Sequence, residues 1–207
     1  MAHVIPFHGT LYNPATVGDV RQVVAPPYDI IDATLQKTLH DRHPNNVIRL
    51  ELGYEQPGDT TGDNKYLRAA GALKEWLKSG ALRRDDKPAI YYHTIEYQPP
   101  YSAPGTPTKV FKGFLSTVEL EEFGSGKIYP HENTRAAAKT DRFNLLEACR
   151  ANFSAIISLY SDPQNDVLTL IEQSIASDKP RIDFQDDVGF RQRLWSVTDP
   201  AVLAKVV

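Results

Sequence analysis

The hydrophobic residues of this chain recur with two different periods, and these periods alternate along the sequence. Apolar residues three and four apart, as on one face of a helix, occur at 32–42, 63–80, 141–151 and 162–175. Runs of β-branched and aromatic residues, typical of strands, occur at 2–12, 47–52, 89–97, 110–120 and 154–160. This order restricts the chain to the α/β (α+β) class, for which we predict a mixed sheet with flanking helices.

Prolines, glycines and polar caps mark where the predicted elements end. Asp63 and Gly80 are the expected N-cap and left-handed C-cap of the most regular helix. Four prolines lie between the strands at 89–97 and 110–120, which predicts a long aromatic hairpin with a stiff tip. That tip is either a solvated loop or a partner-binding surface. A second hairpin is predicted at 181–198.

Composition excludes several classes of protein. The formal net charge is -3 and no run of five like charges occurs, so no nucleic-acid partner is expected. No segment approaches the roughly 20 apolar residues of a membrane span, and the N-terminus lacks a signal peptide. We therefore expect a cytoplasmic protein with no membrane partner. Cys149 is the only cysteine, which excludes an intrachain disulfide and a thiolate-rich metal site.

The segment around Pro26-Pro27 contains the first candidate site. The two prolines fix the backbone, so Tyr28 and Asp29 are held rigidly at the end of an extended segment. Proteins of the α/β class often present ligand-binding groups at such strand ends. The alternative is an Asx turn that starts the next helix.

The loop that enters the 141–151 helix contains the second candidate site. Residues 129–142 combine an imidazole, carboxylates, a hydroxyl and cations: His131, Glu132, Thr134, Arg135, Lys139, Asp141 and Arg142. A helix N-terminus adds about half a positive charge, so the loop suits a phosphate or carboxylate ligand, with Glu132 or His131 as general base. One histidine and one glutamate do not supply a zinc site, and no metal ligands are predicted. The alternative is a solvated charged loop.

Arg150 and Asn152 form the third candidate site, between the 141–151 helix and the strand predicted at 154–160. Arg150 could bind an anion there. The alternative is structural, because Arg in a last helical turn favours the dipole and Asn can satisfy a C-cap. For the helix itself we expect Phe143, Leu146 and Cys149 to face inward.

Several common catalytic motifs do not occur in the sequence. The chain contains no GxxxxGK[ST] phosphate loop, no GxGxxG fingerprint, no GxSxG elbow and no HExxH. The standard templates of P-loop kinases, dehydrogenases, α/β-hydrolases and zinc metalloproteases therefore do not apply.

The three candidate sites lie in stretches that resemble a large bacterial family of proteins, catalogued as domain of unknown function 1015. The resembling stretches are 6–13, 24–31, 66–80, 131–134 with 141–142, and 152–160. One departure is Ala155, where the family pattern leads us to expect proline. Together these stretches cover most of the chain.

The resemblance also implies a distant similarity to the ParB and sulfiredoxin-like superfamily, which includes kinases of free serine. In those kinases a Pro-His-Glu segment supplies the glutamate that acts as base on the substrate hydroxyl. Pro130-His131-Glu132 is similar to that segment, so Glu132 becomes the candidate general base and His131 its neighbour in substrate contact. ATP or ADP with Mg²⁺ are the implied cofactors.

The predicted organisation follows from the Gly124-Ser125-Gly126 break. We expect an N-terminal α/β region with the Pro-rich hairpin at 1–125, and the start of a ParB/serine-kinase-like region at 126–207. Because the apolar residues 201–207 stop without a helix stop signal, we expect a truncated chain whose ParB-like part is incomplete.

The functional hypothesis is a nucleotide-dependent phosphotransferase that acts on a small hydroxyl substrate such as free serine. The fragment alone is expected to be inactive, and the sequence predicts no oligomeric state. The alternative is a non-catalytic nucleotide-binding or protein-interaction module.

Overall fold

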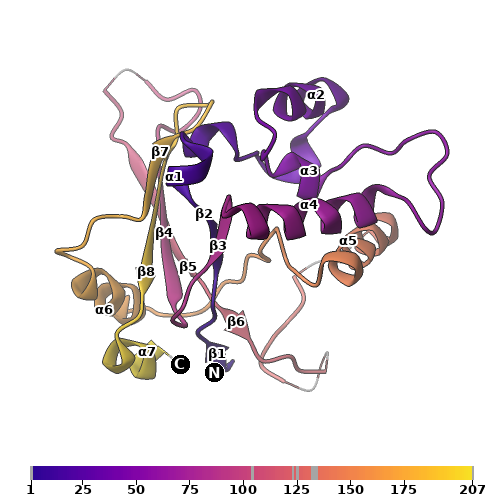
Figure 1. Ribbon diagram of the computed structural model, residues 1–207. Helices are drawn as coiled ribbons and strands as arrows, with labels where there is room; N and C mark the ends of the chain where they lie inside the picture. Colours follow the sequence, from indigo (N-terminus) through magenta and orange to yellow (C-terminus); the bar gives the residue numbers. More distant parts are fainter. Residues whose placement is uncertain (1, 104, 123, 125, 132–134, 207) are drawn as a thin grey trace. The chain divides into compact units, whose positions relative to one another are not determined.

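A computed structural model of the chain describes residues 2–103, 105–122, 124, 126–131 and 135–206. The chain forms two compact units, each built from separate stretches of sequence. The sheet unit comprises residues 1–9, 85–129 and 158–207, and the helical unit comprises residues 10–84 and 130–157. Helices and strands occur together (Figure 1), which confirms the α/β class. The predicted functional regions 1–125 and 126–207 stay a prediction.

The sheet unit is built around a four-stranded antiparallel sheet with the order β5-β4-β8-β7. Its strands are β4 (Ile90–Tyr97), β5 (Lys109–Leu115), β7 (Ile182–Gln185) and β8 (Arg191–Val197). The short strands β1 (Val4–Ile5) and β6 (Thr117–Val118) form a separate pair. The β4–β5 and β7–β8 pairs confirm both predicted hairpins. The predicted mixed sheet is wrong, because every strand pair among the described residues is antiparallel.

Two helices pack against this sheet through an apolar core (Figure 1). They are α6 (Asp166–Ser174) and α7 (Pro200–Val206). The core joins Ile90 and Tyr92 of β4 to Ile171 of α6 and Val202 of α7. Successive strand residues point to opposite faces of a sheet, so the alternate residues of β4 can serve this core.

The helical unit contains five helices and one antiparallel strand pair in its described part. The helices are α1 (Pro14–Val17), α2 (Ala33–Arg42), α3 (Ile48–Glu51), α4 (Lys65–Ser79) and α5 (Ala136–Cys149), with short 3₁₀ turns η1 (Val20–Gln22) and η2 (Tyr28–Ile30). The strands are β2 (Thr10–Tyr12) and β3 (Leu82–Arg84). Trp76 of α4 lies in the core with Val17, Val23 and Leu50.

The ends of α4 largely match the sequence prediction. Gly80 adopts the left-handed conformation with a φ of 78°, as expected. The N-cap is Asn64, one residue after the predicted Asp63, and its side-chain oxygen accepts hydrogen bonds from the backbone of Tyr66 and Leu67. Asp63 instead pairs with Arg68.

The strand predicted at 47–52 is wrong, because these residues form the helix α3. The buried side chain of Asn46 fixes the start of α3: its oxygen accepts from the backbone of Ile48. Its amide donates to the carbonyls of Gln22 and Val24. Ile48, Leu50 and Glu51 are all buried, which strict alternation does not predict. A pattern of only six residues does not distinguish a strand from a short helix, so tertiary contacts decide.

The buried strand predicted at 154–160 is also wrong. This segment pairs with no strand of the described part of the chain, and Ile156 and Leu159 are 92% and 93% exposed. In α5, Leu145 is buried whereas Phe143 and Leu146 are exposed. The prediction that Phe143 and Leu146 face inward is therefore wrong. The helix packs on α4 through the face of Asp141, Arg142 and Leu145 instead.

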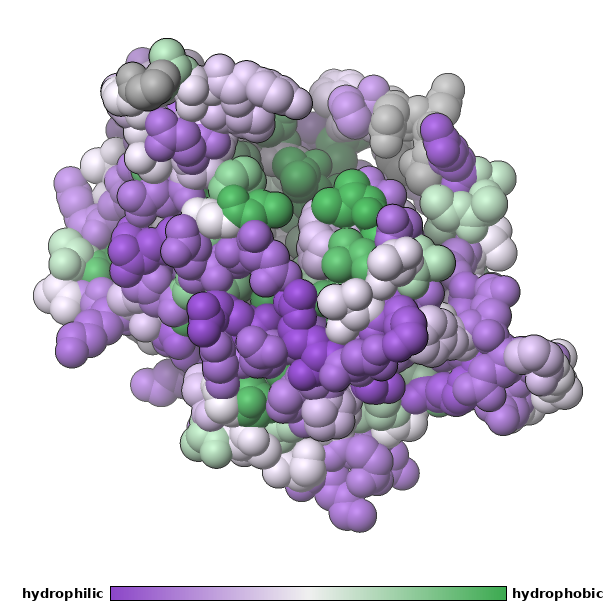
Figure 2. Space-filling view, turned by 90° about the horizontal axis from the view of Figure 1, so that it is seen from above, coloured by the Kyte–Doolittle hydropathy of each residue, from purple (hydrophilic) through white to green (hydrophobic). Residues whose placement is uncertain are grey.

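The helix predicted from Asp162 begins at Asp166, and the Asp162 carboxylate accepts from the backbone of Asp166 and Val167. No helix in the described ranges is long and apolar enough to cross a membrane. Figure 2 shows a face of the molecule that is mostly hydrophilic, with smaller apolar patches.

Candidate functional site

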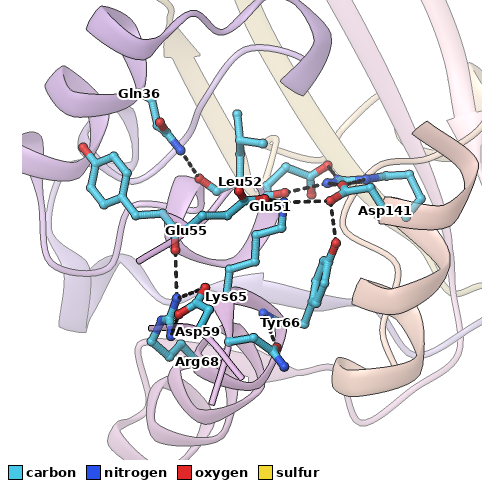
Figure 3. Close-up of polar contacts among 12 residues, drawn as sticks. Gln36, Glu51, Leu52, Glu55, Asp59, Lys65, Tyr66, Arg68 and Asp141 are labelled. Atoms are coloured by element: carbon cyan, nitrogen blue, oxygen red, sulfur yellow. Dashed lines mark hydrogen bonds and ion pairs between the residues drawn. The ribbon is translucent and has the colours of Figure 1, made fainter. Parts of the chain in front are cut away.

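Charged side chains from three helices of the helical unit meet in one cluster (Figure 3). Glu51 ends α3, Lys65 and Tyr66 begin α4, and the neighbouring residues Asp141 and Arg142 lie in the second turn of α5. Hydrogen bonds and ion pairs connect all of these residues. We call them the α3–α4–α5 cluster.

Arg142 is the centre of the cluster. Its Nη1 donates to Oε1 of Glu51 at 2.6 Å, and its Nη2 donates to the Glu51 backbone oxygen at 2.9 Å. Its Nε donates to Oδ2 of Asp141 at 3.1 Å. The guanidinium carbon also lies 4.3 Å from the ring centroid of Tyr28, in cation–π geometry. The guanidinium is thus already neutralised and oriented by the protein itself.

Asp141 links α4 to α5. Its Oδ1 accepts from the Tyr66 hydroxyl at 2.8 Å and pairs with Nζ of Lys65 at 2.9 Å. Burial raises the pKa of the Asp141 carboxyl, but donors on Arg142, Lys65 and Tyr66 outweigh burial and lower this pKa to about 2. The carboxyl is therefore ionised at neutral pH.

Glu51 is the most buried charge of the cluster, with a side chain only 7% exposed. Its Oε1 accepts from Arg142 and from the hydroxyl of Ser154. Its Oε2 is buried and has no hydrogen-bond partner among the described residues. An unmatched buried acceptor of this kind costs about 1–3 kcal/mol, so its presence calls for an explanation.

Two hollows adjoin the cluster. The inner cavity, of about 10 Å³, is lined by residues that include Glu51, Gly53, Asp141 and Arg142. This volume is about that of a single water-sized group. The outer hollow, of about 250 Å³, is lined by Glu55, Gln56, Asp59, Asn64, Lys65 and Tyr66. Lys65 and Tyr66 line both spaces, so the two are neighbours.

The outer hollow is rich in carboxylates. Lys65 pairs with Glu55 at 3.0 Å in addition to Asp141. Arg68 pairs with Asp59 at 2.8 Å and with Asp63 at 2.9 Å. Each cation therefore serves two carboxylates.

The structure brings some of the predicted site residues together and leaves others apart from the cluster. Asp141 and Arg142 belong to the cluster, and the ring of Tyr28 contacts Arg142. Asp29, His131, Arg135, Lys139, Arg150 and Asn152 are exposed, and among the described residues their side chains form no hydrogen bond or ion pair with the cluster. Glu132 and Thr134 lie outside the described residues.

Arg150 has a structural position in the fold. It adopts the left-handed conformation, with a φ of 53°, as the C-cap of α5, and its backbone N–H donates to the carbonyl of Leu146. This favours the structural alternative for Arg150, whereas its proposed anion contact stays a prediction.

Sequence reasoning missed Glu51, Lys65 and Tyr66 as members of the cluster, and Ser154 as a hydrogen-bond donor to Glu51. No local signal marked Glu51 as buried, because the alternation of residues 48–52 assigns Arg49 and Glu51 to the exposed face of a strand. A buried charge is normally paired. The partner of Glu51 lies 91 residues away in the sequence, so the pairing could not be inferred.

The sheet unit contains a second polar network, around Asp85. Its Oδ2 accepts from the Tyr91 hydroxyl at 2.8 Å and from Arg181. The Tyr91 hydroxyl in turn accepts from the backbone N–H of Gly9 at 2.7 Å. Every buried polar side-chain atom that the structure describes in this network has a partner.

Metal ligation finds no support in the described part of the chain, where no three His, Cys, Asp or Glu residues are grouped to hold an ion. A family model with the description "Protein of unknown function (DUF1015)" matches residues 4–207. No curated protein and no solved structure matches the chain. The similarity to ParB-type proteins stays a prediction.

Proposed function

Since the chain belongs to the DUF1015 family, whose model spans residues 4–207, we propose that it takes part in phosphoryl transfer to a small hydroxyl-bearing substrate. Free serine is the candidate substrate, and ATP or ADP with Mg²⁺ is the candidate cofactor. The proposal concerns the helical unit, which holds both the α3–α4–α5 cluster and the loop that enters α5.

The observation that carries the proposal is the arrangement of cations on α5. Arg135, Lys139 and Arg142 are four and three residues apart, so they share one side of the helix. Arg142 is held by two carboxylates, whereas Arg135 and Lys139 are exposed and have no ion-pair partner among the described residues. These two side chains therefore supply the positive charge that a phosphate group needs.

The N-terminus of α5 supports the same assignment. Arg135 occupies the N-cap position and makes no side-chain capping bond, and the first turn contains only alanines and no acidic residue. Backbone N–H groups at such a terminus, together with the helix dipole, favour anions. Small first-turn side chains leave room for a phosphate to approach.

The catalytic roles of Glu132 and His131 are part of the proposal. Both residues precede the first turn of α5 by only a few positions in the sequence. In phosphoryl transfer the protein mainly positions groups and neutralises charge, with one base for the attacking hydroxyl. We assign that base to Glu132.

The test is phosphoserine formation from ATP and free serine by the full-length protein, because the fragment alone is expected to be inactive. If the proposal is correct, Glu132→Gln lowers the rate about 100-fold or more, as expected for a general base. The double variant Arg135→Ala/Lys139→Ala should weaken nucleotide binding about 10-fold or more, through loss of two phosphate contacts. Lys74→Ala is the matched control, since Lys74 is an exposed cation on α4. Equal phosphoserine formation by all four proteins would refute the proposal.

A second candidate function is a non-catalytic binding module. The ion pairs of the cluster favour this function. Lys65 and Arg142 each already pair with two carboxylates, so neither is free to neutralise the charge of a transferred phosphoryl group. Such a module should bind nucleotide or another small ligand in calorimetry without releasing any product. Turnover with free serine separates the two candidates.

A further inference from the structure

The cluster and the outer hollow beside it contain more carboxylates than cations. The carboxylates are Glu51, Glu55, Asp59, Asp63 and Asp141, and the cations are Lys65, Arg68 and Arg142. Five negative charges against three positive charges leave a net formal charge of two negative. This surplus disfavours an anionic ligand and favours a cationic one.

In the described part of this charged region, one buried acceptor receives no hydrogen bond. Oε2 of Glu51 has no hydrogen-bond partner among the described residues, although the side chain is more than nine-tenths buried. The other two buried side-chain atoms without a described partner, Nε2 of His40 and Nε of Arg49, do not line the inner cavity. Glu51 does line it.

We propose that the inner cavity and the outer hollow bind a small molecule through its primary ammonium group, which donates to Oε2 of Glu51. The inner cavity, of about 10 Å³, accommodates one compact donor group, and the outer hollow, of about 250 Å³, holds the rest of the molecule. An ammonium group supplies both the missing hydrogen bond and positive charge against the surplus of carboxylates.

The cluster already binds one ammonium group of its own. Nζ of Lys65 lies 2.9 Å from Asp141 and 3.0 Å from Glu55. Lys65 lines both hollows, and its side chain is drawn in Figure 3. The same chemistry, a primary amine between carboxylates, is what we assign to the ligand. A divalent metal ion is a poorer fit, because Ca²⁺ needs about six to eight oxygen ligands and Lys65 and Arg142 line the same cavity.

A water molecule would also satisfy Oε2 of Glu51. It would leave the surplus of negative charge unchanged, and it would not use the outer hollow. The ammonium proposal therefore predicts a selective ligand where the water alternative predicts none.

This inference rests on the proposed function only for where the substrate binds, and it narrows the substrate class to hydroxyl compounds that carry a primary ammonium group, of which free serine is one. The hydroxyl receives the phosphoryl group and the ammonium group holds the molecule at Glu51. The binding itself requires neither nucleotide nor turnover.

The test is isothermal titration of the chain, without nucleotide, with three probes of similar size. Ethanolamine and ethylamine carry the ammonium group, whereas ethylene glycol carries hydroxyls only. We expect millimolar binding of both amines, about 1–10 mM for so few contacts, and none of ethylene glycol. Binding of all three probes with one affinity, or of none of them, would overturn the proposal and favour a water molecule at Oε2.

Three variants locate the ammonium group. Glu51→Gln should weaken amine binding about 10-fold or more, because it removes the charged acceptor. Glu55→Gln changes an exposed side chain, so the fold is retained, and it should weaken binding about 2- to 3-fold through the loss of one negative charge. Glu75→Gln, an exposed carboxylate elsewhere on α4, is the control and should change nothing.

The outcomes separate this inference from the proposed function. Amine binding that is lost in Glu51→Gln, while the full-length protein forms no phosphoserine from ATP, supports the ammonium site and refutes phosphoryl transfer. If the protein forms phosphoserine and neither Glu51→Gln nor Glu55→Gln changes the rate, the ammonium site is refuted and phosphoryl transfer is supported. If Glu51→Gln does not fold, as judged by its thermal unfolding, an unchanged affinity in Glu55→Gln still overturns the ammonium site.

Discussion

The two units of the chain each contain a network of tyrosine, aspartate, arginine and serine side chains, and the networks differ in how completely their buried acceptors are hydrogen-bonded. Around Asp85, Arg181 donates to the carboxylate and to the Ser196 hydroxyl, and Tyr91 both donates and accepts. Around Glu51, Arg142 and Ser154 share one oxygen, and the other oxygen is left without a described partner. We call these the closed network and the open network.

The difference shows which polar network has a structural role and which one can bind a ligand. A closed network rigidifies the fold, because each buried donor and acceptor is satisfied within the chain. An open network carries an energetic cost that a ligand, ion or water molecule can relieve. Residue types alone do not make this distinction, since both networks combine a carboxylate with arginine, tyrosine and serine.

Removal of the central arginine from each network should give the largest difference. Arg142→Ala leaves the buried Glu51 carboxylate without its counter-charge, and we expect a loss of about 3–5 kcal/mol in the free energy of unfolding. Arg181 is 43% exposed, so Arg181→Ala should cost only about 1 kcal/mol. Urea denaturation of both variants measures the two costs. Equal costs would mean that Glu51 is not held as a buried ion.

Removal of one tyrosine hydroxyl from each network should reverse the order of the two losses in the free energy of unfolding, so that the closed network loses more. Tyr91→Phe leaves the backbone N–H of buried Gly9 without an acceptor and removes a donor from Asp85, at a cost of about 1–3 kcal/mol. Tyr66→Phe removes one of three donors from Asp141, which keeps Lys65 and Arg142, so we expect about 0.5–1.5 kcal/mol.

The measurement is again the free energy of unfolding in urea, with the circular dichroism spectra of both variants as the check on folding. A larger cost for Tyr66→Phe than for Tyr91→Phe would contradict the assignment of the closed network to the Asp85 side chain.

The elements predicted correctly from the sequence are those with local signals. The helix α4 has a polar cap before it and Gly80 after it, and both hairpins have turn residues between long aromatic or β-branched runs. The prediction failed at 47–52 and 154–160, where the apolar pattern is short. There the secondary structure depends on residues that are distant in the sequence. For α3 it depends on the hydrogen bond from Asn46 to Gln22. The segment 154–160 has no strand partner among the described residues.

The candidate site was predictable only in part, for the same reason. Tyr28, Asp141 and Arg142 were found because their chemistry is unusual in the local sequence. Glu51 and Lys65 were missed, because their roles arise from pairing with residues of α5 that lie far away in the chain. Neither the open acceptor on Glu51 nor the surplus of carboxylates can be read from spacing.

Acid should lower the free energy of unfolding through the open network, by less than Arg142→Ala does and within a defined pH range. The pKa of Asp141 is lowered from 3.8 to about 2 in the folded protein, so the unfolded chain binds a proton first as the pH falls. The stabilisation from this carboxylate is fully present above about pH 4 and is lost as the pH falls towards about 2. The side chain is 23% exposed, and with solvent screening we expect about 1–2 kcal/mol. Urea denaturation at a series of pH values should show this loss in the original chain and a shallower slope in Asp141→Asn, and identical slopes would contradict the lowered pKa.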